Sequence, residues 1–285
     1  MSSFDTSTPL QNRQQRTDVN PAIAQSSRTR CFQLTDRWLT RVVRFLEAVY
    51  QGFWLGCLTA DDLNAVTANY FDKSRFYASA GHNLSGFLAW EAPLIERHFQ
   101  PGSRILVAGA GGGREVLAFR KAGFDAEGFE CSLSLIEAGW QIFDQLGETR
   151  GVIYCPPDAV PAGAPTYGGL VIGWGAYTNI PTRQRRVSFL TALRRRALPR
   201  APVLLSFFTR AADSRVDRVV YRCARFSQFF VRARSAPVEM GDHLSLSYFH
   251  SFARNELEDE LREAGFQLTH YKDEGDWGHA IGISK

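Results

Sequence analysis

Residues 103–115 read Ser-Arg-Ile-Leu-Val-Ala-Gly-Ala-Gly-Gly-Gly-Arg-Glu, and this stretch decides the fold. Its apolar run, 105–108, indicates a buried parallel strand that stops at a cluster of glycines, and a helical pattern follows. A strand, a glycine loop and a helix in this order present backbone N–H groups and the positive end of a helix dipole to a bound ligand. Glycines let the ligand approach the backbone closely, because they carry no Cβ atom.

A second strand is expected at 124–129, and Glu130 stands at its end. A carboxylate at the tip of the second strand of such a unit can accept hydrogen bonds from the ribose hydroxyls of a nucleoside. The loop and Glu130 together predict that the chain binds a cofactor containing a nucleoside.

The spacing of the glycines distinguishes between such cofactors. The dinucleotide pattern G-x-G-x-x-G requires a third glycine where this chain has Arg114, which argues against a nicotinamide dinucleotide. The spacing G-x-G-x-G, with Gly109, Gly111 and Gly113, resembles the first motif of the class I S-adenosylmethionine-dependent methyltransferases. This resemblance implies that the loop holds the methionine part of S-adenosylmethionine and that Glu130 holds the ribose.

The family often has an acidic residue two places before the first glycine, and this chain has Val107 there. The ammonium group of the methionine part must then find another acceptor.

The resemblance continues along the chain. After a short strand at 152–154, Asp158 stands where the family has an Asp or Asn that caps the adenine amino group. Segment 167–175 resembles the fourth strand, and Trp174 at its end is implied to line the methyl-transfer region. The fold implied is α/β: a Rossmann-like, seven-stranded, mostly parallel sheet with an antiparallel last strand. The cofactor-binding residues implied are Gly109, Gly111, Gly113, Glu130, Asp158 and Trp174.

Three regions are expected in the 285 residues. Residues 1–30 are polar, with few large apolar side chains, and are expected to be a disordered tail. Residues 31–100 read as helices, and in the family such an N-terminal segment commonly forms a lid or cap over cofactor and substrate. Residues 101–285 form the cofactor-binding domain, with an insertion at about 210–250 after the fifth strand.

The insertion is expected to contain a helix with two faces. Arginines, from Arg215 to Arg232, fall on one face, and apolar residues including Val220, Phe226 and Phe230 fall on the other. Such a helix usually has a solvated face opposite a core face. Contact of the arginines with an anionic substrate or partner is the alternative.

Composition restricts the partners. No apolar run approaches the 18 residues of a membrane span, so no membrane partner is expected. A net charge of +4, with 29 acidic residues, argues against nucleic-acid binding. Five scattered cysteines without a C-x-x-C spacing favour a reduced, cytoplasmic protein. A small-molecule substrate is therefore expected, and a homodimer is left open.

Methyl transfer needs alignment above all, because a methyl group on a sulfonium is already activated. A general base is needed only where the acceptor must lose a proton. The catalytic candidates are Tyr177, just beyond the fourth strand, and His243 and His250 in the insertion; Tyr70 and Tyr77 of the lid are candidates for substrate binding. No two of the six histidines have metal-ligand spacing, so no metal site is expected.

The sequence thus predicts an S-adenosylmethionine-dependent methyltransferase acting on a small-molecule acceptor. Two alternatives stay open. One is a methyltransferase-like binding or scaffold subunit without catalysis, which Val107 favours. The other is a nicotinamide-dependent oxidoreductase, which Arg114 disfavours.

Overall fold

The computed structural model describes residues 26–164, 166–211, 214–231 and 236–285. Most of the expected disordered tail, residues 1–25, lies outside the described residues, while 27–30 already belong to helix α1 (Ser27–Cys57). The chain divides into two compact units, 1–44 and 45–285, and α1 contributes to both. In the described part of the first unit nearly all residues are helical; all further features belong to the second.

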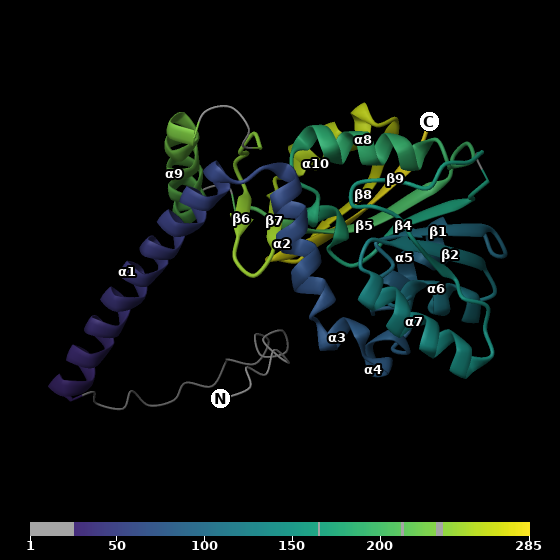
Figure 1. Ribbon diagram of the computed structural model, residues 1–285, viewed down its shortest axis with the longest axis horizontal. Coiled ribbons are helices and arrows are strands. Elements are labelled where there is room, and N and C mark those ends of the chain that lie inside the picture. Colours follow the sequence, from purple (N-terminus) through teal and green to yellow (C-terminus); the bar gives the residue numbers. More distant parts are fainter. Residues whose placement is uncertain (1–25, 165, 212–213, 232–235) are drawn as a thin grey trace. The chain divides into compact units, whose positions relative to one another are not determined.

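The second unit is built on a sheet with the predicted topology (Figure 1). Strands β3, β2, β1, β4 and β5 lie side by side and parallel, and β9 follows antiparallel to its neighbours β5 and β8. These seven strands confirm the predicted, mostly parallel sheet with an antiparallel last strand, and two strands of the insertion bring the sheet to nine. The strand bounds are β1 (Arg104–Ala108), β2 (Asp125–Glu130), β3 (Val152–Tyr154), β4 (Gly169–Ile172), β5 (Pro202–Thr209), β8 (Phe266–Asp273) and β9 (Trp277–Ser284).

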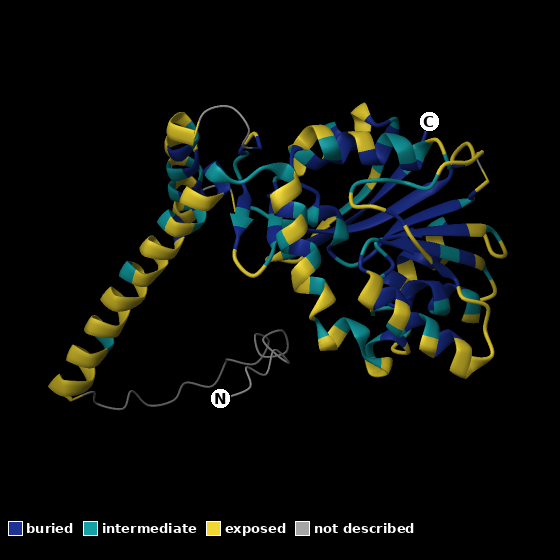
Figure 2. Ribbon diagram, in the orientation of Figure 1, coloured by how far each residue is buried: buried dark blue, intermediate teal, exposed yellow. Residues whose placement is uncertain are grey.

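Helices cover both faces of this sheet, whose strands are mostly buried (Figure 2). Side chains along β1 alternate: Ile105 and Val107 pack into one apolar cluster, and Leu106 and Ala108 into another. The first cluster includes residues of α5 (Glu91–His98), α6 (Arg114–Lys121) and α7 (Leu133–Leu146); the second includes residues of α8 (Arg183–Arg194) and α10 (Arg254–Glu263). A three-layer α/β core results.

The register brings three strand ends to one edge. Ala108, the last residue of β1, pairs with Phe129 on β2 and with Ile172 on β4. The loops that follow these strands therefore begin side by side, and the N–H of Gly173 donates to the Ala108 carbonyl at 2.8 Å. This is the edge at which open α/β sheets bind ligands.

Short helices precede the sheet, as predicted for the lid. They are α2 (Ala60–Asp72), α3 (Arg75–Ala78), α4 (Ala80–Asn83) and α5. Helix α2 begins at a reciprocal cap, in which Asp62 N donates to Thr59 Oγ1 and Thr59 N donates to an Asp62 carboxylate oxygen at 2.8 Å.

The insertion consists of α9 (Arg215–Val231) and a hairpin of β6 (Asp242–Leu244) and β7 (Tyr248–Phe252). Strand β7 runs parallel to the end of β5, where Phe208 pairs with Ser251. A third apolar cluster, which includes Ala48, Leu63, Val220 and Tyr248, joins the hairpin to α9, α2 and the C-terminal part of α1.

The predicted core face of α9 was wrong in part. Its buried residues are Asp217, Val220, Ala224 and Ser227, while Phe226 and Phe230 are exposed. The cause is the close approach of α1: a Cβ added to Gly56 would lie 1.9 Å from Ser227 Oγ. Only small side chains fit between backbones at this separation, so the large aromatic residues face outward.

Within the described residues, no helix combines the length and the apolarity that crossing a membrane would require.

Candidate cofactor and acceptor site

A cavity lies at the carboxyl ends of β1, β2 and β4, and residues of the lid line one side of it. The sheet side is formed by the glycine loop, by residues 129–132 at the end of β2 and just beyond it, and by residues 155–159 after β3. The lid side is formed by Asn64, Thr67, Ala68, Phe71, Tyr77, His82 and Asn83. The structure thus brings most of the predicted cofactor residues to one enclosed place.

The glycines of the loop share positive φ angles but differ in the space around them. Gly109, Gly111 and Gly113 have φ angles of 64°, 53° and 99°, a region that side chains rarely adopt. A Cβ on Gly111 would have nothing nearer than 4.0 Å, so this glycine borders open space in the cavity. A Cβ on Gly109 would meet Ala176 Cβ at 2.6 Å.

Gly113, also expected to bind the cofactor, is not among the residues that line the cavity. A Cβ there would lie 2.7 Å from the ring of Phe143, so this glycine lets α6 begin against α7.

Glu130 ties the loop to the start of α7. Its Oε2 accepts a hydrogen bond from Gly111 N at 2.9 Å, and its Oε1 accepts from Cys131 N and Ser132 N at 2.7 and 2.9 Å. A carboxylate offers about four acceptor positions, so capacity for a ligand hydroxyl remains. Burial, and then the Glu130 carboxylate, strongly raise the pKa of the neighbouring Cys131 thiol, which keeps it protonated.

Asp158 and Trp174 also line the cavity. Asp158 Oδ2 accepts from Asn64 Nδ2 at 2.7 Å and lies 3.0 Å from Arg185 Nη1, so this carboxylate joins the lid to α8. Trp174 packs edge-on against Trp277, with ring centroids 4.9 Å apart.

The structure contains a buried acidic group near the glycine loop that the sequence analysis did not identify. Glu115 lines the cavity and lies 2.6 Å from Arg114 Nη2, whose guanidinium also makes a two-point contact with Glu91 at 2.8 and 2.9 Å. Two buried carboxylates therefore share one guanidinium. Burial raises the pKa of Glu115, and Arg114 opposes that shift.

The signal for this group was present in the sequence. Arg114 occupies the place of the third dinucleotide glycine, and Glu115 follows it directly. Arg114 also contacts Glu91, and the sequence does not predict that Glu91 lies beside it.

The lid contributes Tyr77 and His82 to the cavity, whereas Tyr70 does not line it. The ring of His82 packs against those of Phe76 and Tyr77, with centroids 4.7 and 5.2 Å away. Burial, and then the charge of Arg114, lower the pKa of His82 below its usual 6.5. His82 is therefore neutral near pH 7 and can accept a proton.

No protein-family model matches the sequence, and no curated protein matches it. Solved structures do resemble it. An S-adenosylmethionine-dependent methyltransferase from Methanosarcina mazei is similar with a TM-score of 0.54 and 18% identity, over 67% of this chain and 97% of that one. The chain has the fold of the class I S-adenosylmethionine-dependent methyltransferases.

A second similar structure contains ligands. It is the 1,6-didemethyltoxoflavin-N1-methyltransferase of Burkholderia thailandensis, with 1,6-didemethyltoxoflavin and S-adenosylhomocysteine bound. Its TM-score is 0.52 at 14% identity, over 79% of this chain and 87% of that one. The structural similarity shows the fold, and at these sequence identities it does not show the reaction.

The three catalytic candidates named from the sequence lie outside the cavity of this methyltransferase fold. Tyr177 is wholly buried, and its hydroxyl donates to Glu260 Oε2 at 2.5 Å. His243 Nε2 lies 3.5 Å from Asp217 Oδ1. Tyr177 and His243 each contact an acidic partner within the protein and do not line the cavity, so the geometry does not support a direct catalytic role.

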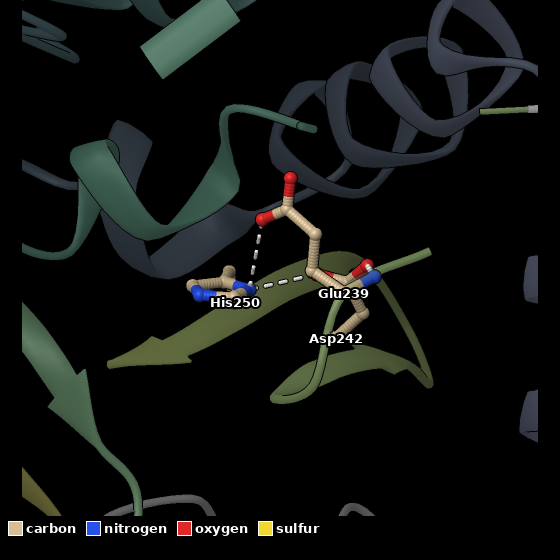
Figure 3. A group of neighbouring side chains, drawn as sticks. All are labelled: Glu239, Asp242 and His250. Atoms are coloured by element: carbon tan, nitrogen blue, oxygen red, sulfur yellow. Dashed lines mark hydrogen bonds and ion pairs between the residues drawn. The ribbon is translucent and has the colours of Figure 1, made fainter. Parts of the chain in front are cut away.

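His250 belongs to a buried network in the insertion (Figure 3). Its Nδ1 lies 2.7 Å from Asp242 Oδ1 and 4.0 Å from Glu239 Oε2, and these three residues could offer ligand atoms to a metal ion. Their spacing in the sequence gave no sign of this. Arg186 Nη2 lies 2.6 Å from Glu239 Oε2, and the Tyr248 hydroxyl donates to Asp242 at 2.8 Å. A guanidinium thus supplies the positive charge beside these carboxylates. Among the described residues, the buried Nε2 of His250 has no hydrogen-bond partner.

Proposed function

We propose that this protein transfers a methyl group from S-adenosylmethionine to a small-molecule acceptor. The observation that carries the proposal is the hydrogen bond from Gly111 N to Glu130, beside a cavity that Asp158 also lines. The glycine loop, Glu130 and Asp158 lie in the order and places that the methyltransferase resemblance implies.

The residues of the cavity suit the parts of this cofactor. Glu130 would accept hydrogen bonds from the ribose hydroxyls, and Asp158 from the adenine amino group. Gly111 leaves room for the methionine part, and Glu115 supplies a carboxylate for its ammonium group. When bound, S-adenosylmethionine supplies a methyl group on a positively charged sulfur.

Glu115 also bears on the alternative of a non-catalytic subunit. That alternative rested on Val107, which leaves the usual acidic position empty. Glu115 provides a buried carboxylate in the same cavity, from the first turn of α6. This carboxylate is the proposed acceptor for the methionine ammonium, and its presence weakens the argument for a scaffold subunit.

The acceptor is placed by the lid and the end of β4. Phe71, Tyr77 and Trp174 give the cavity aromatic surface, which suits an apolar or aromatic small molecule. Where the acceptor atom carries a proton, His82 is the cavity residue suited to remove it, because its pKa is lowered and its imidazole is neutral.

Calorimetric titration of the full chain tests this function. S-adenosylmethionine and S-adenosylhomocysteine should both bind, and NAD should not. Binding of NAD alone would favour an oxidoreductase. Binding of none of the three would favour the scaffold alternative and overturn the proposal.

A further inference from the structure

The surface formed by α9 and the last turns of α1 combines large aromatic side chains with arginines. On α9, Phe226, Phe229 and Phe230 are 68%, 78% and 66% exposed. On α1, Tyr50, Phe53 and Trp54 are exposed as well. Single exposed apolar residues are ordinary, but six aromatic residues on two adjoining helices indicate a surface that contacts a partner.

The two helices form a fixed platform for these side chains. Ser227 Oγ donates to the Phe53 carbonyl at 3.1 Å, and a Cβ on Gly52 would lie 2.4 Å from the Val220 carbonyl oxygen. Residues adjacent to this contact, Phe53 on one helix and Phe226 on the other, point outward. The close backbone packing therefore holds both aromatic groups on the exterior of one helix pair.

Arginines share the outward side of α9. Arg215, Arg218, Arg222 and Arg225 are exposed, and within the described residues none of the four lies within 4 Å of a carboxylate. Asp217, the acidic residue of this helix, is buried and faces His243. The face is therefore basic toward its N-terminal half and aromatic toward its C-terminal half.

We propose that this aromatic and arginine-bearing surface binds the headgroup region of a bilayer that contains anionic phospholipids. Aromatic side chains at the lipid–water boundary and basic side chains beside the phosphates are the combination that peripheral helices use. This proposal differs from the expectation of no membrane partner, because that expectation was based only on the lack of a membrane-spanning segment.

The charge distinguishes this partner from a second copy of the chain. A symmetric contact through the same surface would bring the four unpaired arginines of each copy into one interface, where like charges repel. An anionic bilayer instead neutralises all four. The inference does not depend on the proposed methyl transfer.

Sedimentation of the full chain with vesicles tests the proposal. The protein should bind phosphatidylcholine–phosphatidylglycerol vesicles and bind phosphatidylcholine vesicles far more weakly, and added salt should weaken binding. Sedimentation velocity without lipid should show a monomer. Failure to bind anionic vesicles, or equal binding to both kinds, would overturn the proposal. A dimer that Phe226→Ser/Phe229→Ser dissociates would overturn it in favour of self-association.

Paired variants separate the contributions of the aromatic side chains and of the arginines to vesicle binding. Phe226→Ser/Phe229→Ser and Arg218→Gln/Arg222→Gln should each weaken vesicle binding by roughly tenfold or more. The matched controls are Leu133→Ser/Leu146→Ser and Arg97→Gln/Arg195→Gln, which alter exposed residues elsewhere and should bind as the wild type does. All four are surface changes, and circular dichroism confirms that each variant is folded. Equal loss in variants and controls would contradict the assigned surface.

Discussion

The backbone N–H of Gly111 donates a 2.9 Å hydrogen bond to Oε2 of Glu130. The glycine loop and the carboxylate at the end of β2 are therefore one structural unit. A change at Glu130 should disturb the loop as well as remove a ligand contact.

Replacing Glu130 tests this unit. Glu130→Ala removes the acceptor of three backbone N–H groups and the proposed ribose contact. Each lost charged hydrogen bond costs about 1.5–3 kcal/mol, so cofactor affinity should fall at least tenfold and the melting temperature should also fall. Calorimetry and thermal unfolding measure both effects. Glu137→Ala, an exposed change on α7, is the control; unchanged affinity in Glu130→Ala would remove this residue from the site.

Glu91 and Glu115 form a matched pair, because both contact the guanidinium of Arg114. Glu115→Gln leaves Arg114 paired with Glu91, so the fold should remain stable while cofactor affinity falls. Glu91→Gln breaks a two-point buried pair and should lower the melting temperature more. The reverse pattern, with affinity lost only in Glu91→Gln, would show that Glu115 does not contact the cofactor.

The two loop glycines Gly111 and Gly113 should respond differently to valine. A side chain at 111 enters open cavity space, so Gly111→Val should abolish cofactor binding, with backbone strain of about 1–3 kcal/mol as its main cost in stability. A side chain at 113 meets Phe143 at 2.7 Å, so Gly113→Val should unfold at a much lower temperature. Titration and thermal unfolding separate the two. Normal cofactor binding by Gly111→Val would show that the cofactor lies elsewhere.

Stability should depend on pH through His279. This buried histidine stacks on Trp90 and His270, and burial, then His270, lower its pKa from 6.5 to about 4. Below pH 6.5 the His279 imidazole is protonated in the unfolded chain but stays neutral in the folded chain until the pH approaches 4. The contribution of His279 to the free energy of unfolding is therefore present in full above pH 6.5. It declines as the pH falls and levels off near pH 4.

Denaturant unfolding at several pH values measures this effect. The free energy of unfolding of the wild type should fall between pH 7 and pH 4 more steeply than that of His279→Gln. The control Arg195→Gln, an exposed change away from these histidines, should keep the wild-type slope. Parallel slopes for the wild type and His279→Gln would contradict the assignment.

The features that the sequence predicted correctly are those that short stretches determine. The apolar run 105–108, the glycine cluster and the end of β2 at Glu130 lie close together in the chain, and their register needs only parallel pairing. The ligand edge follows from this local pattern, whereas the sheet with its antiparallel last strand was implied by the resemblance to the methyltransferases.

The features that were wrong or missed depend on distant residues. The outward turn of Phe226 and Phe230 follows from Gly52 and Gly56, which lie far away in the sequence. Tyr177 follows β4 as expected, but its hydroxyl is buried and donates a hydrogen bond to Glu260. Position along a strand predicts which edge a residue occupies, and it does not predict the direction of the side chain.

A crystal structure of the full chain with S-adenosylhomocysteine tests the central claim most directly. The ligand should occupy the cavity beside Gly111, with its ribose hydroxyls within hydrogen-bonding distance of Glu130. Its adenine amino group should face Asp158, and its ammonium group should face Glu115. A ligand bound outside this cavity, or a ribose without contact to Glu130, would contradict the account.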